Sequence, residues 1–197
     1  MRTTSGLTRK ATCNLKLAKH GGRWYCSEGS TKERLGFGRY QFWVIGRLDG
    51  LDPNVVFGLF NYPTPDVGPD GTNEIDIEFA KWGKPKAAIG NYTVWPTHEG
   101  LRRASKRFPV ELNGEYTTHR FIWNSTGVAF QSLHGHQDDD SSQFEDWLYR
   151  PQDPRKYIPQ EAMPVDINLW LFQGQPPRNG RQEVELVVRS FKFTPAP

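Results

Sequence analysis

Short runs of hydrophobic residues, many alternating with polar ones, recur along the whole chain between Gly, Pro, Asn and Asp. The runs are rich in β-branched and aromatic residues, and a period of two in such runs is typical of β-strands. They predict nine strands, at residues 14–19, 38–46, 54–61, 73–79, 86–95, 117–123, 127–133, 166–173 and 182–193. The pattern therefore indicates a chain of strands with almost no helix.

The segments between the predicted strands carry turn-forming residues. Residues 124–127 are interpreted as a β-hairpin turn, in which Gly127 supplies a positive φ. Residues 63–71 and 137–161 are too long, too polar and too rich in Pro for hairpin turns. Loops of that length in a compact domain are more often functional than idle.

The longer of these two loops holds features of its own. Asp138-Asp139-Asp140 is interpreted as a solvated acidic tip, because no spaced oxygen ligands accompany it. Trp147 either caps a cleft or anchors the loop. Just before the loop, His134 and His136 have metal-like spacing but no third ligand nearby, so we interpret them as part of a surface hairpin. We expect no metal and no cofactor.

The length of 197 residues suits a single domain, 1–197, with one substantial core. Hydrophobic residues make up only 36% of the chain, but aromatic residues reach 13%, so the core must be built from large rings. A protein of strands must bury one face of each sheet. We therefore expect an all-β, antiparallel β-sandwich whose outer face is free for binding or catalysis.

The net charge of +3 is too small to require nucleic acid or an acidic membrane as a partner. Every apolar run is far shorter than the roughly 20 residues that span a bilayer. The first residues lack the apolar stretch of a signal peptide, and residues 1–11 are expected to be a flexible or truncated N-terminal segment. We expect a monomer that acts outside the cell or in the periplasm. Cys13 and Cys26 leave two possibilities open, one disulfide bridge or two thiols.

Carboxylate and aliphatic residues alternate strictly between positions 74 and 79. On a strand, this alternation sends Glu74, Asp76 and Glu78 to one face and the hydrophobic residues between them to the core. Three like charges on one face repel one another. The three acids are therefore either a plain solvent-facing row or a functional row in which one or more carboxyl groups are protonated. Glycoside cleavage is a function that uses such a row, because it needs one protonated and one ionised carboxyl group.

The segment Glu74-Ile75-Asp76-Ile77-Glu78-Phe79 resembles the active-site signature of glycoside hydrolase family 16, the family of laminarinases, lichenases, agarases and xyloglucan transglycosylases. Supporting likenesses occur at residues 37–40, 118–123, 168–170 and 188–193, so the resemblance covers roughly residues 12 to 194.

The resemblance implies a concanavalin A-like jelly roll with a cleft on its concave face, and a retaining endo-glycosidase that hydrolyses a β-glucan or a galactan by double displacement. It implies that Glu74 is the nucleophile, Glu78 the general acid/base and Asp76 the residue that tunes both. Two carboxyl groups must approach to about 5–5.5 Å for this mechanism, so the strand must bend. The resemblance also implies that Asn168 and Trp170 contact sugar. For Trp170, a place in the core remains the alternative.

Asn91 and Trp95 share one face of the strand after the acidic one. If that face is the concave one, the Asn91 amide binds a sugar hydroxyl and the Trp95 ring stacks on a sugar. The opposite parity would present Tyr92 instead. The chain departs from the family at Thr72, where several members have Trp, and at Arg189, which stands near a calcium-binding aspartate of some members, so no calcium is expected.

Three other functions remain open. A carbohydrate-binding module could keep the same sandwich and acids without turnover, and a transglycosylase would use the same two carboxyl groups with a sugar as the acceptor. Nucleic-acid binding would rest on Arg102, Arg103, Lys106 and Arg107, a basic run that we interpret as a solvated loop beside an acidic cleft.

Overall fold

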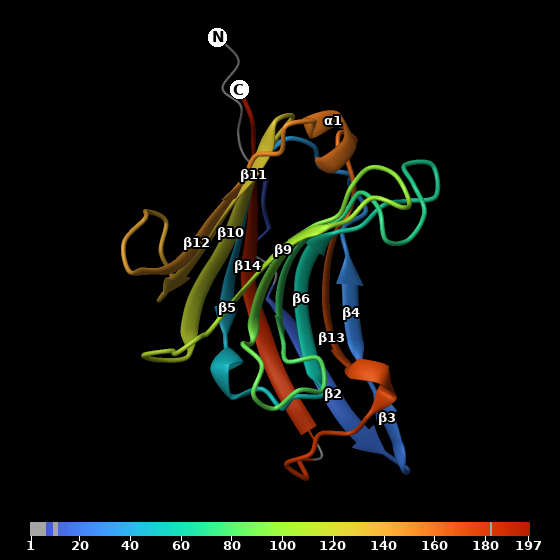
Figure 1. Ribbon diagram of the computed structural model, residues 1–197. Helices are drawn as coiled ribbons and strands as arrows, with labels where there is room; N and C mark the ends of the chain where they lie inside the picture. The colour runs from blue at the N-terminus through green and yellow to red at the C-terminus, as the bar shows by residue number, and fades with distance from the viewer. Residues whose placement is uncertain (1–6, 10–11, 182) are drawn as a thin grey trace.

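Two antiparallel β-sheets packed face to face make up the structure, a computed structural model that describes residues 7–9, 12–181 and 183–197 (Figure 1). Sheet A has the strand order β12-β11-β10-β5-β14-β2-β3, with β1 also paired to β14, and sheet B has the order β4-β13-β6-β7-β8-β9. The architecture is the all-β jelly-roll sandwich that the sequence predicts.

The strands of sheet A are β1 (Leu7–Arg9), β2 (Cys13–His20), β3 (Arg23–Tyr25), β5 (Gly38–Ile45), β10 (Tyr116–Asn124), β11 (Gly127–His134), β12 (Gln143–Tyr149) and β14 (Glu183–Pro195). The strands of sheet B are β4 (Ser27–Ser30), β6 (Val55–Asn61), β7 (Ile75–Ala80), β8 (Gly90–Val94), β9 (Ala104–Phe108) and β13 (Val165–Leu171). Three short helical turns, η1 (Leu48–Gly50), α1 (Pro154–Tyr157) and η2 (Phe172–Gly174), connect them.

All nine predicted strands are present, and the prediction missed the shorter or more polar β1, β3, β4, β9 and β12. Two expectations about loops are therefore wrong. Residues 137–161 contain β12, which pairs with β11 at the edge of sheet A. The basic run at residues 102–107 is not a loop either, because it leads into and forms most of β9.

Large aromatic rings fill the space between the sheets, as the composition predicts. Tyr40 stacks on Phe121 with ring centroids 4.5 Å apart, and Tyr92 stacks on Phe130 at 4.8 Å. Trp147 also stacks on Phe130, with centroids 5.5 Å apart, so of the two roles expected for it the structure supports anchoring β12 to the core.

The hairpin between β10 and β11 forms as predicted, with Asn124 opposite Gly127. The reason for its glycine differs from the prediction, because Gly127 is not among the residues with a left-handed backbone. A side chain at this position would instead collide with the Tyr149 carbonyl oxygen, 2.7 Å from an added Cβ. Close approach of β12, rather than turn geometry, therefore favours glycine here.

Cys13 and Cys26 are both free thiols. β3 pairs with the far end of β2, where Tyr25 lies opposite Ala18, so Cys26 lies about four residues, or ~13 Å, along the strand from Cys13. Disulfides need Cα atoms within about 7 Å. The bridge that the sequence left open is thus absent.

The three residues of the Asp138–Asp140 tip are exposed, as expected, and the tip also contacts the outer face of sheet A. The Arg120 guanidinium, only 1% exposed, forms an ion pair with Asp140 and donates to the Asp139 carbonyl oxygen at 2.9 Å. In the N-terminal segment 1–11, Leu7–Arg9 form β1, and residues 1–6 and 10–11 lie outside the described residues. Among the described residues, no helix is long and apolar enough to cross a membrane.

Candidate active site

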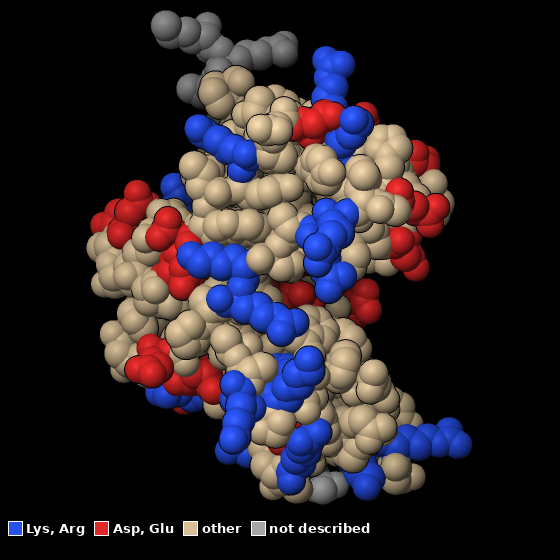
Figure 2. Space-filling view, in the orientation of Figure 1, with Lys and Arg blue, Asp and Glu red and all other residues tan. Residues whose placement is uncertain are grey.

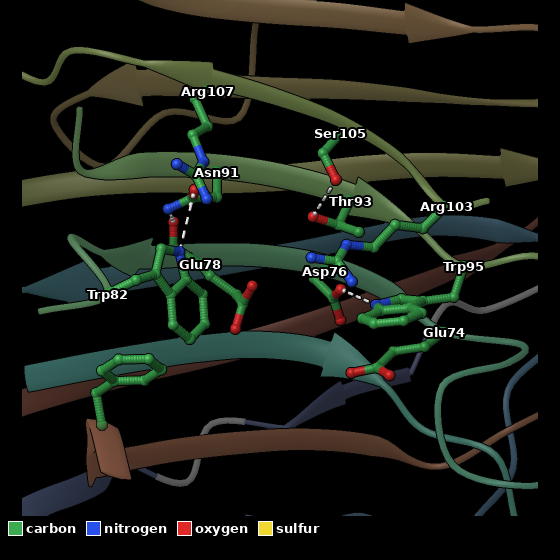
Figure 3. Close-up of a pocket in the computed structure, with 11 residues that line it drawn as sticks. Glu74, Asp76, Glu78, Trp82, Asn91, Thr93, Trp95, Arg103, Ser105 and Arg107 are labelled. Atoms are coloured by element: carbon green, nitrogen blue, oxygen red, sulfur yellow. Dashed lines mark hydrogen bonds between the residues drawn. The ribbon is translucent and has the colours of Figure 1, made fainter. Parts of the chain in front are cut away.

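A cleft of about 490 Å³ opens on the outer face of sheet B, over strands β7, β8 and β9 (Figure 3). We call it the acidic cleft. Its lining residues are Glu74, Asp76, Glu78, Trp82, Asn91, Thr93, Trp95, Arg103, Ser105, Arg107 and Phe172. Three strands, the segments that connect them and the helical turn η2 thus converge on one open groove.

The three carboxyl groups of the acidic row all project into this cleft, with Asp76 between Glu74 and Glu78 (Figure 3). Glu74 directly precedes β7, and the other two acids belong to it. The residues between them are fully buried in the core, with 0% exposure for Ile75 and Ile77. The structure therefore separates the two faces of β7 as the alternation predicts.

Glu74 is only partly exposed, and burial is the main reason that its pKa is raised to about 7. The nearby Glu78 carboxyl also raises this pKa, whereas a side-chain hydrogen bond with Asp76 and the charge of Arg103 lower it. Glu74 can consequently change its protonation state near neutral pH.

Burial also holds the pKa values of Asp76 and Glu78 well above their usual range. Repulsion by a neighbouring carboxylate adds to the effect, from Glu74 on Asp76 and from Asp76 on Glu78. The indole Nε1–H of Trp95 donates to Asp76 Oδ2 at 2.9 Å and partly offsets it. The group can therefore keep Glu78 protonated while Glu74 and Asp76 share a proton, so that one carboxyl donates and another attacks.

Two tryptophans flank the carboxyl groups (Figure 3). Trp95 was expected at the site, and Trp82 was not. Trp82 follows β7 in a left-handed turn with φ 52° and packs edge-on against Phe172, with centroids 5.5 Å apart. Aromatic rings at both ends of the row give flat apolar surfaces of the kind that stack on sugar rings.

The parity of β8 is the one that presents Asn91 rather than Tyr92 to the cleft, since Tyr92 is fully buried in the core. Asn91 itself is only 3% exposed. Its amide nitrogen donates to the carbonyl oxygens of Ala80 and Ile89 at 3.0 and 2.8 Å, and its oxygen accepts from Trp82 Nε1 at 3.4 Å. The hydrogen bonds of the Asn91 side chain thus hold the turn at Trp82 in place.

The two residues expected on β13 do not line the acidic cleft. Trp170 packs edge-on against Trp82, with ring centroids 6.4 Å apart. Asn168 is opposite Gly58 of β6, and its Oδ1 is buried without a hydrogen-bond partner. Gly58 makes this approach possible, because an added Cβ would lie 2.7 Å from that oxygen.

Several cleft residues were missed from the sequence. Arg103, Ser105 and Arg107 alternate along the cleft face at β9, and Thr93 Oγ1 lies 3.2 Å from Ser105 Oγ. The period of two at residues 103, 105 and 107 could have predicted a strand with these side chains on one face. The interpretation of residues 102–107 as a loop concealed it. Within the described ranges, no group of three or more His, Cys, Asp or Glu side chains could hold a metal ion.

Comparison with solved structures places the fold among β-glucanases. The chain aligns with a Bacillus licheniformis β-glucanase at TM-score 0.64 and 20% identity, over 93% of this chain and 78% of that one. It aligns with a pseudo β-1,3-glucanase and immunostimulatory antigen of Mycobacterium tuberculosis at TM-score 0.69 and 18% identity, over 94% and 75%. A family 16 mixed-linkage glucan enzyme of Bacteroides ovatus, solved with a product, gives TM-score 0.66 and 12% identity, over 93% and 81%.

No family model matches the chain, and no curated protein matches it by sequence. The structural likenesses therefore establish a fold like that of glycoside hydrolase family 16, as the resemblance implied, and leave the activity to be argued from the site.

Proposed function

We propose that the chain is a retaining endo-glycosidase that hydrolyses a β-linked polysaccharide, either a β-glucan or a galactan. One observation carries the proposal: three carboxyl groups with raised pKa values lie side by side in an open cleft between two tryptophans. Such a set supplies both the acid and the nucleophile that glycoside cleavage needs.

In the first step, protonated Glu78 gives its proton to the glycosidic oxygen, and the leaving part of the polymer departs with it. The Glu74 carboxylate attacks the anomeric carbon from the opposite face, which forms a covalent glycosyl ester. Both groups point into the same cleft, and the buried position of Glu78 keeps its proton available at neutral pH (Figure 3).

In the second step, Glu78 is ionised and accepts a proton from water, and that water attacks the anomeric carbon. The Glu74 carboxylate leaves, so the product keeps the configuration of the substrate. If a sugar hydroxyl enters in place of water, the same two groups perform transglycosylation.

Asp76 would act through its neighbours in this scheme. Its hydrogen bond with Glu74 lowers the Glu74 pKa, so a proton held on Asp76 favours an ionised nucleophile. Trp95 fixes the Asp76 carboxyl from the other side. Asp76 is thus assigned a positioning and proton-holding role.

The surroundings of the cleft suit a polymer rather than a small sugar. A hollow lined by Trp82, Phe172 and Arg178 adjoins one end of the acidic cleft, and another, lined by Trp95, Leu101 and Arg102 among others, adjoins the other end. A chain could continue past the carboxyl groups in both directions, which is the requirement for endo cleavage. Because such polymers are met outside cells, we propose an extracellular or periplasmic location.

Digestion of a panel of β-glucans and galactans tests the proposal, with reducing ends counted and the anomeric configuration of the first products followed by NMR. We expect release with retained configuration, and a loss of about 10²–10⁴-fold in Glu78→Gln. The matched control is Glu111→Gln, which removes an exposed carboxylate that does not line the cleft. Inverted first products would contradict double displacement.

A carbohydrate-binding protein without turnover is the second candidate. It is favoured by the fold's likeness to a protein described as a pseudo β-1,3-glucanase. Polysaccharide binding by the parent chain, with no bond cleaved on any member of the panel, would favour this candidate over the enzyme.

A further inference from the structure

The strand that borders the acidic cleft presents cations to it. Ser105 and Arg107 of β9 and Arg103, which directly precedes it, all line the cleft, and both arginines are exposed. We call these three residues the β9 wall. Lys106 lies on the opposite face, where its Nζ is 2.7 Å from Glu145 Oε1 and 2.7 Å from the Asp146 carbonyl oxygen. Lys106, the cation of this strand that faces away from the cleft, therefore has an ion-pair partner.

The two cations of the β9 wall are not paired. Among the described residues, neither guanidinium takes part in an ion pair or a side-chain hydrogen bond, although Arg103 lies over the Trp95 ring at 4.4 Å. The positive charge of Arg103 lowers the pKa values of the three acids, although Arg103 forms no hydrogen bond or ion pair with any of them. Each guanidinium therefore keeps a fork of N–H donors that fits a carboxylate, sulfate or phosphate group.

The register places the two arginines level with the two ends of the carboxyl row. Arg107 lies opposite Asn91, and Asn91 lies opposite Glu78. Arg103 is four residues away, about 13 Å along the strand, beside Trp95 at the Glu74 end. Figure 3 shows the same order, with Arg107 near Asn91 and Arg103 near Trp95.

We propose that the polysaccharide cleaved in this cleft carries anionic groups, sulfate esters or carboxylates, which Arg103 and Arg107 bind on either side of the scissile bond. The proposal rests on the proposed function and specifies its substrate class. A neutral sugar gives no reason to leave two guanidiniums unpaired in a cleft, whereas an anionic substituent supplies the missing partner.

The acids on the cleft floor do not prevent this binding. Their burial favours the protonated forms, so the floor carries less negative charge than three ionised carboxylates would. On the surface, Lys and Arg side chains form a band down the face that carries β9, and acidic side chains lie recessed beside it (Figure 2). These basic side chains gather on one face, although the whole chain has a net charge of only +3.

The test compares one neutral β-glucan with its sulfated and carboxymethylated derivatives, and one sulfated galactan with its desulfated form. For each pair, kcat/KM is measured for the parent chain and for Arg103→Gln, Arg107→Gln and the control Arg23→Gln, an exposed arginine on β3 of sheet A. We expect the anionic polymers to be preferred roughly ten- to hundredfold, the value of one or two charge-assisted hydrogen bonds.

Either cleft variant should lower that preference by roughly tenfold, and Arg23→Gln should leave it unchanged. Preference for the sulfated or for the carboxymethylated derivative identifies which anion is bound. Equal cleavage of charged and neutral forms would overturn the proposal, as would a preference that survives both substitutions. Equal competition by an oligothymidylate of the same charge would also overturn it, because the wall would then bind any polyanion.

The same polymers are run in affinity electrophoresis against Glu74→Gln. If no polymer is cleaved but anionic polymers still retard this variant in a manner that depends on Arg103 and Arg107, the proposed hydrolysis fails and the anionic ligand class stands. If cleavage occurs without regard to charge, the hydrolysis stands and the ligand class fails.

Discussion

Replacing Glu74 with Gln should make the protein more stable at neutral pH while removing its activity. The Glu74 pKa is about 7 in the folded protein, because burial penalises the carboxylate, against an ordinary value of 4.5. The folded state therefore binds this proton more tightly than the unfolded state does. Stability is lost as pH rises from about 4.5 to about 7, and the loss is complete above pH 7.

The size of the loss follows from the two pKa values. A tenfold difference in proton affinity is worth about 1.4 kcal/mol, so the step from 4.5 to about 7 corresponds to roughly 3 kcal/mol at pH 8. A Gln at position 74 has no proton to lose, and its amide can still donate to Asp76. Because the Gln amide is itself a polar group in a partly buried place, we expect a net gain of about 1–3 kcal/mol.

Urea denaturation of the parent, Glu74→Gln and the control Glu111→Gln at pH 4 and pH 8 measures this effect. The stability of Glu74→Gln should exceed that of the parent at pH 8 and match it near pH 4, where the parent carboxyl is protonated in both states. The control removes an exposed carboxylate and should follow the parent at both values. A Glu74→Gln protein that is no more stable than the parent at pH 8, or a difference that does not change with pH, would refute the reasoning.

Three further changes probe the site and its support. Glu78→Gln should slow cleavage of a polysaccharide far more than cleavage of an aryl glycoside, whose leaving group needs little protonation, and equal losses in the two rate assays would contradict the role of Glu78 as the acid. Gly90→Ala should destabilise the fold by about 1–3 kcal/mol in urea, because the added methyl group would overlap the Phe108 ring, and a change under about 0.5 kcal/mol would contradict this packing. Tyr92→Phe should cost about 1–3 kcal/mol, since the buried hydroxyl donates to Ser132 Oγ at 2.7 Å, and unchanged thermal unfolding would show that this bond contributes nothing.

The strands that the sequence predicted are those whose inward positions are hydrophobic, such as β7 and β8. β9 was missed because the middle one of its inward positions is Lys106, which forms an ion pair with Glu145 rather than being buried among apolar groups. β12 escaped because a register irregularity between Ser132 and Leu133 of its partner strand interrupts its alternation. In both cases a tertiary contact replaces the local pattern that sequence reasoning uses.

Part of the candidate site could also be predicted from the sequence, namely the residues that follow the alternation of a strand. The alternation of the acidic row settles which face of β7 lines the cleft, and the parity of Trp95 follows once β8 is paired with β7. Trp82 had no such signal, because its place depends on a left-handed turn that Asn91 stabilises from the next strand. Trp170 contacts the ring of Trp82 but does not itself line the cleft, a relation that only the packed structure reveals.

The central claim is that Glu74 attacks the sugar while Glu78 supplies the proton, and trapping the covalent intermediate tests it most directly. The parent chain is incubated with an activated 2-deoxy-2-fluoro glycoside of a sugar that it cleaves, and the modified peptide is sequenced by mass spectrometry. The account predicts one glycosyl ester on Glu74, absent from Glu74→Gln. An ester on Asp76 or Glu78, or no ester in a chain that cleaves the parent sugar with inversion, would contradict it.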